Sequence, residues 1–420
     1  MKKLSSKYFL LIAILVSLQI PFKSSAYSVL THEAIIDVSW DKSIRPILKS
    51  RYPGSTEAEF KKARAYSYGG AILADMGYYP FGASFFTELV HYVRSGDFVI
   101  ALMEEAQDIN EYAFALGALA HYTSDNYGHP LGINLAVPLA YPKVREKYGN
   151  TVTYEQDRTS HLRMEFGFDV LETARGNYES LAYHDFIGFE VARPVLERAF
   201  IKTYGLDINK VFVNLSLALG TFRWAVKNLI PEATKYAWII KKSEIVKLNP
   251  QAQAKKFRYK MSKANYYKEF GKERTKPPIG SRALSMLLRI VPKIGPLKGL
   301  RFNNPGLEAE KLFTQSFDTV VACYASFLNK SISGKLRLEN KDFDTGKLTV
   351  PGEYHLADEN YGQLLLKLKK EKFDHMNPSL KKDIISFYSQ ADSTILVKEN
   401  QKGWKEIVES LEMLKSVSCN

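Results

Sequence analysis

The sequence predicts an all-α protein with a small mixed region at its C-terminal end. Up to about residue 330, apolar residues recur at the three- and four-residue spacing of helices, and helix-capping patterns precede several of these runs. The 420-residue chain is 45% hydrophobic and 25% charged, so it can bury a large core. This composition excludes a disordered chain and a disulfide-stapled miniprotein.

The first 26 residues have the pattern of a signal peptide. Three lysines precede an apolar run at 8–20, and two small residues, Ser24 and Ala26, stand at positions −3 and −1 of the expected cleavage site. The run is short for a membrane span, and an uncleaved anchor is the alternative. We therefore expect Tyr27 to be the mature N-terminus of a secreted or periplasmic protein.

Capping patterns predict where the first helices begin. A Ser, Thr or Asp before a helix accepts its first N–H groups, and a Glu three residues later completes a capping box. The expected caps are Thr31 before a helix from His32, Thr56 with Glu59, Asp108 with Glu111, and Ser160 before 161–175. Further helices are expected at 190–204, 211–229 and 312–328.

The helix that begins at Ile109 is expected to be central and buried. Ile109, Tyr112 and Leu116 fall on one face of it. Alanine and glycine fill most of 113–120, and such small residues let neighbouring helices approach closely.

The segment 241–301 differs from the rest of the chain. It carries 17 Lys and Arg against 3 Glu, and its second half mixes these with Leu, Ile and Met. We expect it to be a basic insertion that contacts membranes, within a helical domain at 27–330.

The last 90 residues are expected to form a C-terminal appendage at 331–420. Within it, 335–338 and 347–350 alternate apolar and polar residues on either side of Asp344-Thr345-Gly346. This pattern predicts a β-hairpin.

The chain has two cysteines, Cys323 and Cys419, and no CxxC motif. A zinc site built on thiolates is therefore excluded. A disulfide between the two is possible in an oxidising compartment, but the sequence does not establish it.

Histidines and carboxylates recur four residues apart in the N-terminal half. The pairs are His121 with Asp125, Asp125 with His129, and His161 with Glu165. Residues at this spacing share a helix face, so two side chains can hold one ion. Imidazole and carboxylate without sulfur are typical ligands of hydrolytic zinc sites. The plain alternative is a solvated helix face or a capped core histidine, but burial beside Ala120 would make unpaired groups costly.

Four sequence blocks resemble the zinc-dependent phospholipase C family. That family includes the catalytic domain of glycosylphosphatidylinositol-specific phospholipase D, and it shares its fold with fungal single-strand nucleases. The blocks are the expected N-terminus at 27–35, the stretches 75–80 and 90–92, the signature at 120–130, and 160–165. The remaining histidines, His184, His355 and His375, share no metal spacing.

By position, the resemblance implies a cluster of three zinc ions. One ion would take Asp75, His91, His121 and Asp125; a second would take His129, His161 and Glu165; the third would take the amine and carbonyl of Tyr27 with His32 and a bridging oxygen of Asp125. A free amine at residue 27 exists only after cleavage, so the cluster would assemble after export. Asp75 or Asp125 would orient the attacking water or accept its proton.

The resemblance implies a hydrolase that degrades phospholipids in the phospholipase C manner. Two alternatives stay open: a nuclease of the same fold, and a zinc-stabilised protein that docks on membranes without turnover. The apolar half of 241–301 favours an anionic bilayer surface, whereas its basic and aromatic residues would also suit a nucleic-acid strand. A solvated lysine-rich insertion is the plain alternative, and no protein partner is inferred.

Overall fold

The computed structural model describes residues 29–175, 178, 189–226, 242–244, 246–247, 302–390 and 401–418. Within these ranges the protein consists of helices and connecting loops, so the predicted all-α class is confirmed. The N-terminal helices are α2 (Val29–Ser39), η1 (Trp40–Ile44), α3 (Arg45–Arg51), α4 (Glu57–Leu73), η2 (Ala74–Tyr78), α5 (Ser84–Tyr92), α6 (Ser95–Glu104) and α7 (Ile109–Gly128). Next come η3 (His129–Ile133), α8 (Asn134–Ala140), α9 (Pro142–Tyr148), α10 (Arg158–Arg175), α12 (Arg193–Tyr204), α13 (Ile208–Val211) and α14 (Leu215–Trp224). The C-terminal helices are α18 (Gly306–Ile332), α19 (His355–Lys370), α20 (Pro378–Ser389) and α22 (Gln401–Ser416).

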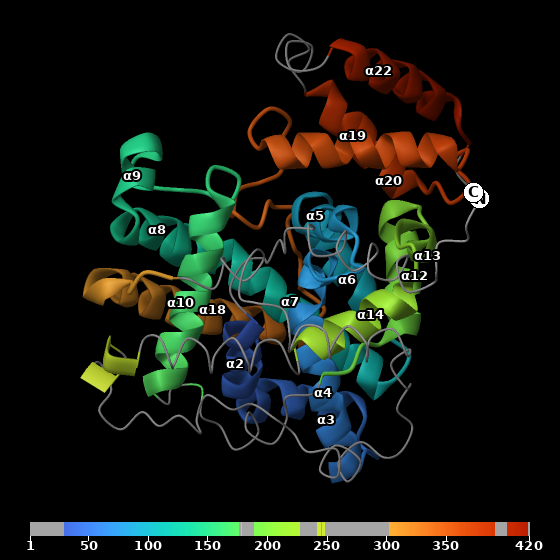
Figure 1. Cartoon of the computed structure of the whole chain (residues 1–420). Helices are drawn as coiled ribbons and strands as arrows, with labels where there is room; N and C mark the ends of the chain where they lie inside the picture. Colours follow the sequence, from blue (N-terminus) through green and yellow to red (C-terminus); the bar gives the residue numbers. More distant parts are fainter. Residues whose placement is uncertain are drawn as a thin grey trace, which may run out of the picture.

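Helix α7 lies at the centre of the fold, as its small residues predict (Figure 1). Helices α4, α6 and α18 pack against it. The approach of α4 is closest at two glycines: a Cβ on Gly70 would lie 1.9 Å from Phe114 O, and one on Gly117 would lie 2.0 Å from Ser67 O. Only glycine permits this backbone contact, which fixes the position of the C-terminal half of α7.

Two of the four expected helix caps are confirmed. Thr56 and Glu59 form a complete capping box at the start of α4. Asp108 accepts hydrogen bonds from the first N–H groups of α7, while Glu111 accepts one from Gln107 N instead of closing the box.

The other two caps are corrected by the structure. Helix α2 already includes Thr31, whose N–H and hydroxyl both donate to the distant carboxylate of Asp169. Helix α10 begins at Arg158, and Asp157 rather than Ser160 accepts the free N–H there. In both cases a stronger acceptor, a buried carboxylate or a preceding aspartate, replaces the expected hydroxyl.

Helices α19, α20 and α22 gather at one end of the molecule, where α19 packs against α5 (Figure 1). Arg94, buried before α6, joins this end to the body. Its guanidinium donates to Thr203 O at 2.7 Å and to Ser379 Oγ at 2.8 Å. The division into 27–330 and 331–420 stays a prediction; α18 runs without a break across residue 330.

The structure does not support the predicted β-hairpin. Residues 335–350 contain no strand, and one antiparallel bridge joins Lys341 to Leu348. The backbone of this loop is hydrogen-bonded to the helical body instead: Tyr122 Oη donates to Glu339 O, Ser95 Oγ donates to Lys341 O, and Phe343 N donates to His91 O. These contacts occupy backbone N–H and C=O groups that a longer ladder between two strands would need for its own hydrogen bonds.

Several expectations fall on residues outside the described ranges. These are the signal peptide at 1–26, Tyr27, Cys419 and nearly all of the basic segment 241–301. Among the helices that the structure does describe, none is both long and apolar enough to cross a membrane.

The close contact of α4 with α7 predicts a strong effect of one added methyl group. Although alanine favours a helix over glycine by about 1 kcal/mol, Gly70→Ala or Gly117→Ala should lower the free energy of unfolding by about 2 kcal/mol, because the new Cβ meets backbone. Chemical denaturation measures this change. Gly54→Ala is the control, since nothing lies within 4 Å of its Cβ position. Unchanged stability of both helix variants would contradict the backbone contact between α4 and α7.

Candidate metal centre

Six elements bring the predicted ligand side chains to one place. The side chains are His32 on α2, Asp75 on η2, His91 on α5, His121 and Asp125 on α7, His129 on η3, and His161 and Glu165 on α10. Each of these residues is at most 3% exposed. The cluster is therefore an interior feature, and a solvated helix face is excluded for all of these residues.

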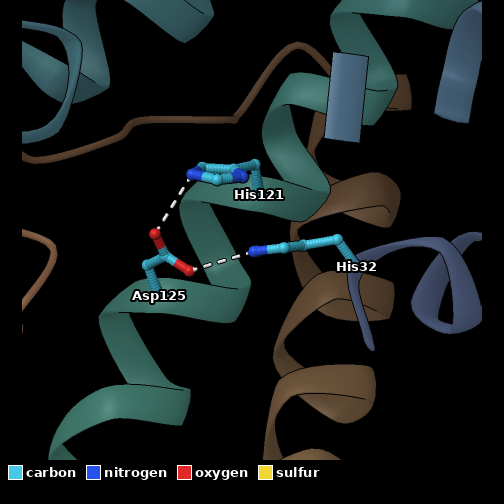
Figure 2. Close-up of side chains that lie close together, drawn as sticks. All are labelled: His32, His121 and Asp125. Carbon is cyan, nitrogen blue, oxygen red and sulfur yellow. Dashed lines mark ion pairs between the residues drawn. The ribbon is translucent and has the colours of Figure 1, made fainter. Parts of the chain in front are cut away.

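Asp125 is the hub of the cluster. Its Oδ2 lies 3.1 Å from Nε2 of His121, one helical turn before it, and its Oδ1 lies 3.5 Å from Nε2 of His32. Figure 2 shows these two imidazoles approaching opposite oxygens of the one carboxylate. His91 Nε2 lies 3.5 Å from Oδ2, and His129 Nε2 lies 4.0 Å from Oδ1. Both oxygens of Asp125 are thus placed to bridge neighbouring ligand groups.

The ligand atoms form three groups, each spanning no more than 4.8 Å. The groups are His32, His121 and Asp125; Asp75, His91 and His121; and His129, His161 and Glu165. The third matches one predicted ligand set completely. The first two share His121 and together contain the remaining predicted side chains, while Tyr27 lies outside the described ranges.

Two imidazoles are oriented by backbone carbonyls. Nδ1 of His91 lies 2.7 Å from Thr87 O, and Nδ1 of His121 lies 2.8 Å from Ala71 O. A carbonyl is only an acceptor, so each Nδ1 carries the proton. Nε2 of each ring then faces the cluster, so it is the nitrogen that would bind a metal once its proton is displaced.

The donor set fits a divalent cation. Among the described residues, Oδ1 of Asp75, both carboxylate oxygens of Asp125 and Oε1 of Glu165 are buried without a hydrogen-bond donor. Burying such oxygens is costly unless a charge compensates them. Nitrogen and oxygen donors in groups of three, without sulfur, suit zinc.

The pKa values show how strongly the groups interact. Burial alone would raise the pKa of Asp125, but His121, His91 and His129 hold it well below its ordinary value. Burial likewise opposes a charge on His91, yet Asp125 and Asp75 raise its pKa to about 9. Burial raises the pKa of Glu165 well above its ordinary value. A nearby cation would favour the ionised form of that carboxylate.

Aromatic side chains surround one side of the cluster. They line a small cavity of about 10 Å³ together with two ligands and one further carboxylate: Tyr78, Tyr92, Tyr154, Phe343, His91, His129 and Asp344. This volume holds about one water molecule.

Sequence reasoning missed Asp344. The expected hairpin places this residue in its turn, but Asp344 is 1% exposed and its Oδ1 lies 3.4 Å from Nδ1 of His129. Neighbouring Phe343 packs its ring 5.1 Å from that of His91. No spacing signal links these residues to the histidines, because they are far apart in the sequence.

A buried cluster of imidazoles and carboxylates of this kind is typical of the metal sites of hydrolytic enzymes. Residues 31–212 match the family model described as zinc dependent phospholipase C. This match contains all the described candidate ligands, and it confirms the resemblance for residues 31–212. No curated protein and no solved structure matches the chain.

The central place of His121 and Asp125 predicts loss of metal when either is changed. His121→Ala or Asp125→Asn should weaken zinc retention by more than the roughly 10- to 100-fold that loss of an outer partner costs. Elemental analysis of the purified chain after dialysis measures bound zinc.

The matched control is His375→Ala, because His375 is 48% exposed and lies outside the three groups. It should keep the wild-type zinc content. Wild-type zinc content in both cluster variants would refute the assignment of these residues as ligands.

Proposed function

We propose that the protein is a zinc-dependent phosphodiesterase that hydrolyses phospholipids by a phospholipase C-type reaction. The observation that carries the proposal is the set of buried carboxylate oxygens without hydrogen-bond donors, facing four histidines inside a zinc-dependent phospholipase C domain. Such a domain supports a hydrolase of this general type.

The described side chains would hold the metal as the sequence predicts. Asp75, His91, His121 and Asp125 would serve one zinc ion, and His129, His161 and Glu165 a second. A third ion would use His32, Asp125 and the N-terminal amine of Tyr27 once the signal peptide is removed. When bound, zinc neutralises the anionic phosphodiester and makes water more acidic.

The chain's own groups have two roles in this reaction. Asp75 and Asp125 are the carboxylates beside His91 and His121, so either can orient the attacking water and accept its proton. The aromatic wall of Tyr78, Tyr92 and Tyr154 limits bulk water around the cluster. Water adds to phosphorus, the bond to the glycerol oxygen breaks, and diacylglycerol leaves with the proton.

Two further features of the chain fit this proposal. Cleavage after Ala26 would deliver a secreted or periplasmic enzyme. The basic and apolar segment 241–301 would bring it to an anionic membrane surface, where the substrate lies.

Metal removal tests the proposal. Treatment with EDTA should abolish hydrolysis of phosphatidylcholine vesicles, and added zinc should restore it, because the proposed reaction needs the cation to neutralise the phosphate and to make water more acidic. Thin-layer chromatography of the lipid products measures the reaction, with EDTA already saturated with zinc as the control.

The products separate the alternatives. Release of diacylglycerol supports the phospholipase C reaction. Release of phosphatidic acid would instead indicate a phospholipase D reaction. Cleavage of single-stranded DNA without any lipid product would favour the nuclease. Bound zinc without turnover of either substrate would leave a membrane-docking protein.

A further inference from the structure

Asp344 lies outside the domain match but contacts the metal centre. It belongs to the loop between α18 and α19, more than 130 residues beyond the end of the match at residue 212. Its side chain is buried, and Oδ1 faces Nδ1 of His129 at 3.4 Å. The opposite nitrogen of that ring, Nε2, lies 3.8 Å from Oε1 of Glu165. The imidazole of His129 therefore lies between the carboxylates of Asp344 and Glu165.

Asp344 is held firmly in this position. Its Oδ2 accepts hydrogen bonds from Tyr154 N and from Tyr354 Oη, both at 2.8 Å. Its backbone oxygen accepts a third from Asn134 Nδ2 at 2.8 Å. With Oδ2 occupied by two donors, Oδ1 is left facing His129.

This arrangement differs from that of the other oriented histidines. His91 and His121 place Nδ1 against backbone carbonyls, whereas His129 places it against a carboxylate. A carboxylate is the stronger acceptor, so it fixes the proton on Nδ1 and makes Nε2 more basic. Such outer partners govern how tightly a histidine binds its metal.

We propose that Asp344 is a positioning residue that fixes the tautomer and orientation of His129 and thereby strengthens zinc binding at His129, His161 and Glu165. The proposal rests on the metal-binding role of the cluster in the proposed function. Under this proposal, the loop that follows α18 contributes to metal binding, although it lies outside the matched residues 31–212.

Asp344→Asn is a sharp test because of the donors around Oδ2. Tyr154 N can only donate, so the new amide keeps its oxygen on that side and turns its NH₂ group toward His129. A donor there favours the tautomer with the proton on Nε2, which cannot bind zinc. We expect about 10- to 100-fold weaker zinc binding in the full chain, measured by competition with a chromophoric chelator.

Asp342→Asn is the matched control. Asp342 is a buried carboxylate in the same loop, but it accepts hydrogen bonds from N and Oγ1 of Thr345. It should bind zinc as the wild type does. In cobalt-substituted protein, the visible absorption bands should shift for Asp344→Asn and stay unchanged for Asp342→Asn, because only the former alters a ligand's tautomer.

Each outcome decides the proposal. Wild-type zinc affinity and an unchanged cobalt spectrum in Asp344→Asn would overturn it, and so would an equal loss in the two variants, which would assign the effect to loop conformation. If Asp344→Asn does not fold, judged by circular dichroism, Tyr354→Phe takes its place. That variant removes one donor to Asp344, and it should show a smaller loss in the same direction, whereas no loss would overturn the proposal. A wild-type chain that binds neither zinc nor cobalt would refute the metal centre itself, and the positioning role with it.

Discussion

The structure depends on keeping one ionised carboxylate, Asp125, inside a helical core. A charge in such a place needs close partners on several sides, and four histidines from four other positions in the chain provide them. Their convergence is possible because α4 and α7 touch backbone to backbone at Gly70 and Gly117. A wider separation of these helices would move His121 away from its carbonyl partner on α4, Ala71 O.

Local signals in the sequence predict the class of fold and the pairing of His121 with Asp125, while the wider ligand set is implied by the family resemblance. The capping box of Thr56 and Glu59 and the small residues of α7 act within one helix, so they can be recognised without a structure. The same holds for the four-residue spacing of His121 and Asp125, which places both side chains on one face.

Features set by distant contacts could not be predicted in this way. Asp169 binds the start of α2 from almost 140 positions away, so the cap expected at Thr31 is replaced. The residues around Asp344 have the alternation of a hairpin, but this loop makes hydrogen bonds to α5, α6 and α7, and only one antiparallel bridge forms within it among the described residues. In both cases tertiary contacts decide between local structures of similar propensity.

The loop that carries Asp344 also has a consequence for the order of assembly. His129 and Asp344 are 215 positions apart, and Gly346 packs against Asn126 O so closely that an added Cβ would lie 2.4 Å from it. Closing such a distant contact comes after local helix formation, since its entropic cost is met only once the intervening chain is in place. A nascent chain that has just emerged through residue 212 would therefore have every described ligand but an incomplete enclosure, and the interior would be sealed only near the end of synthesis.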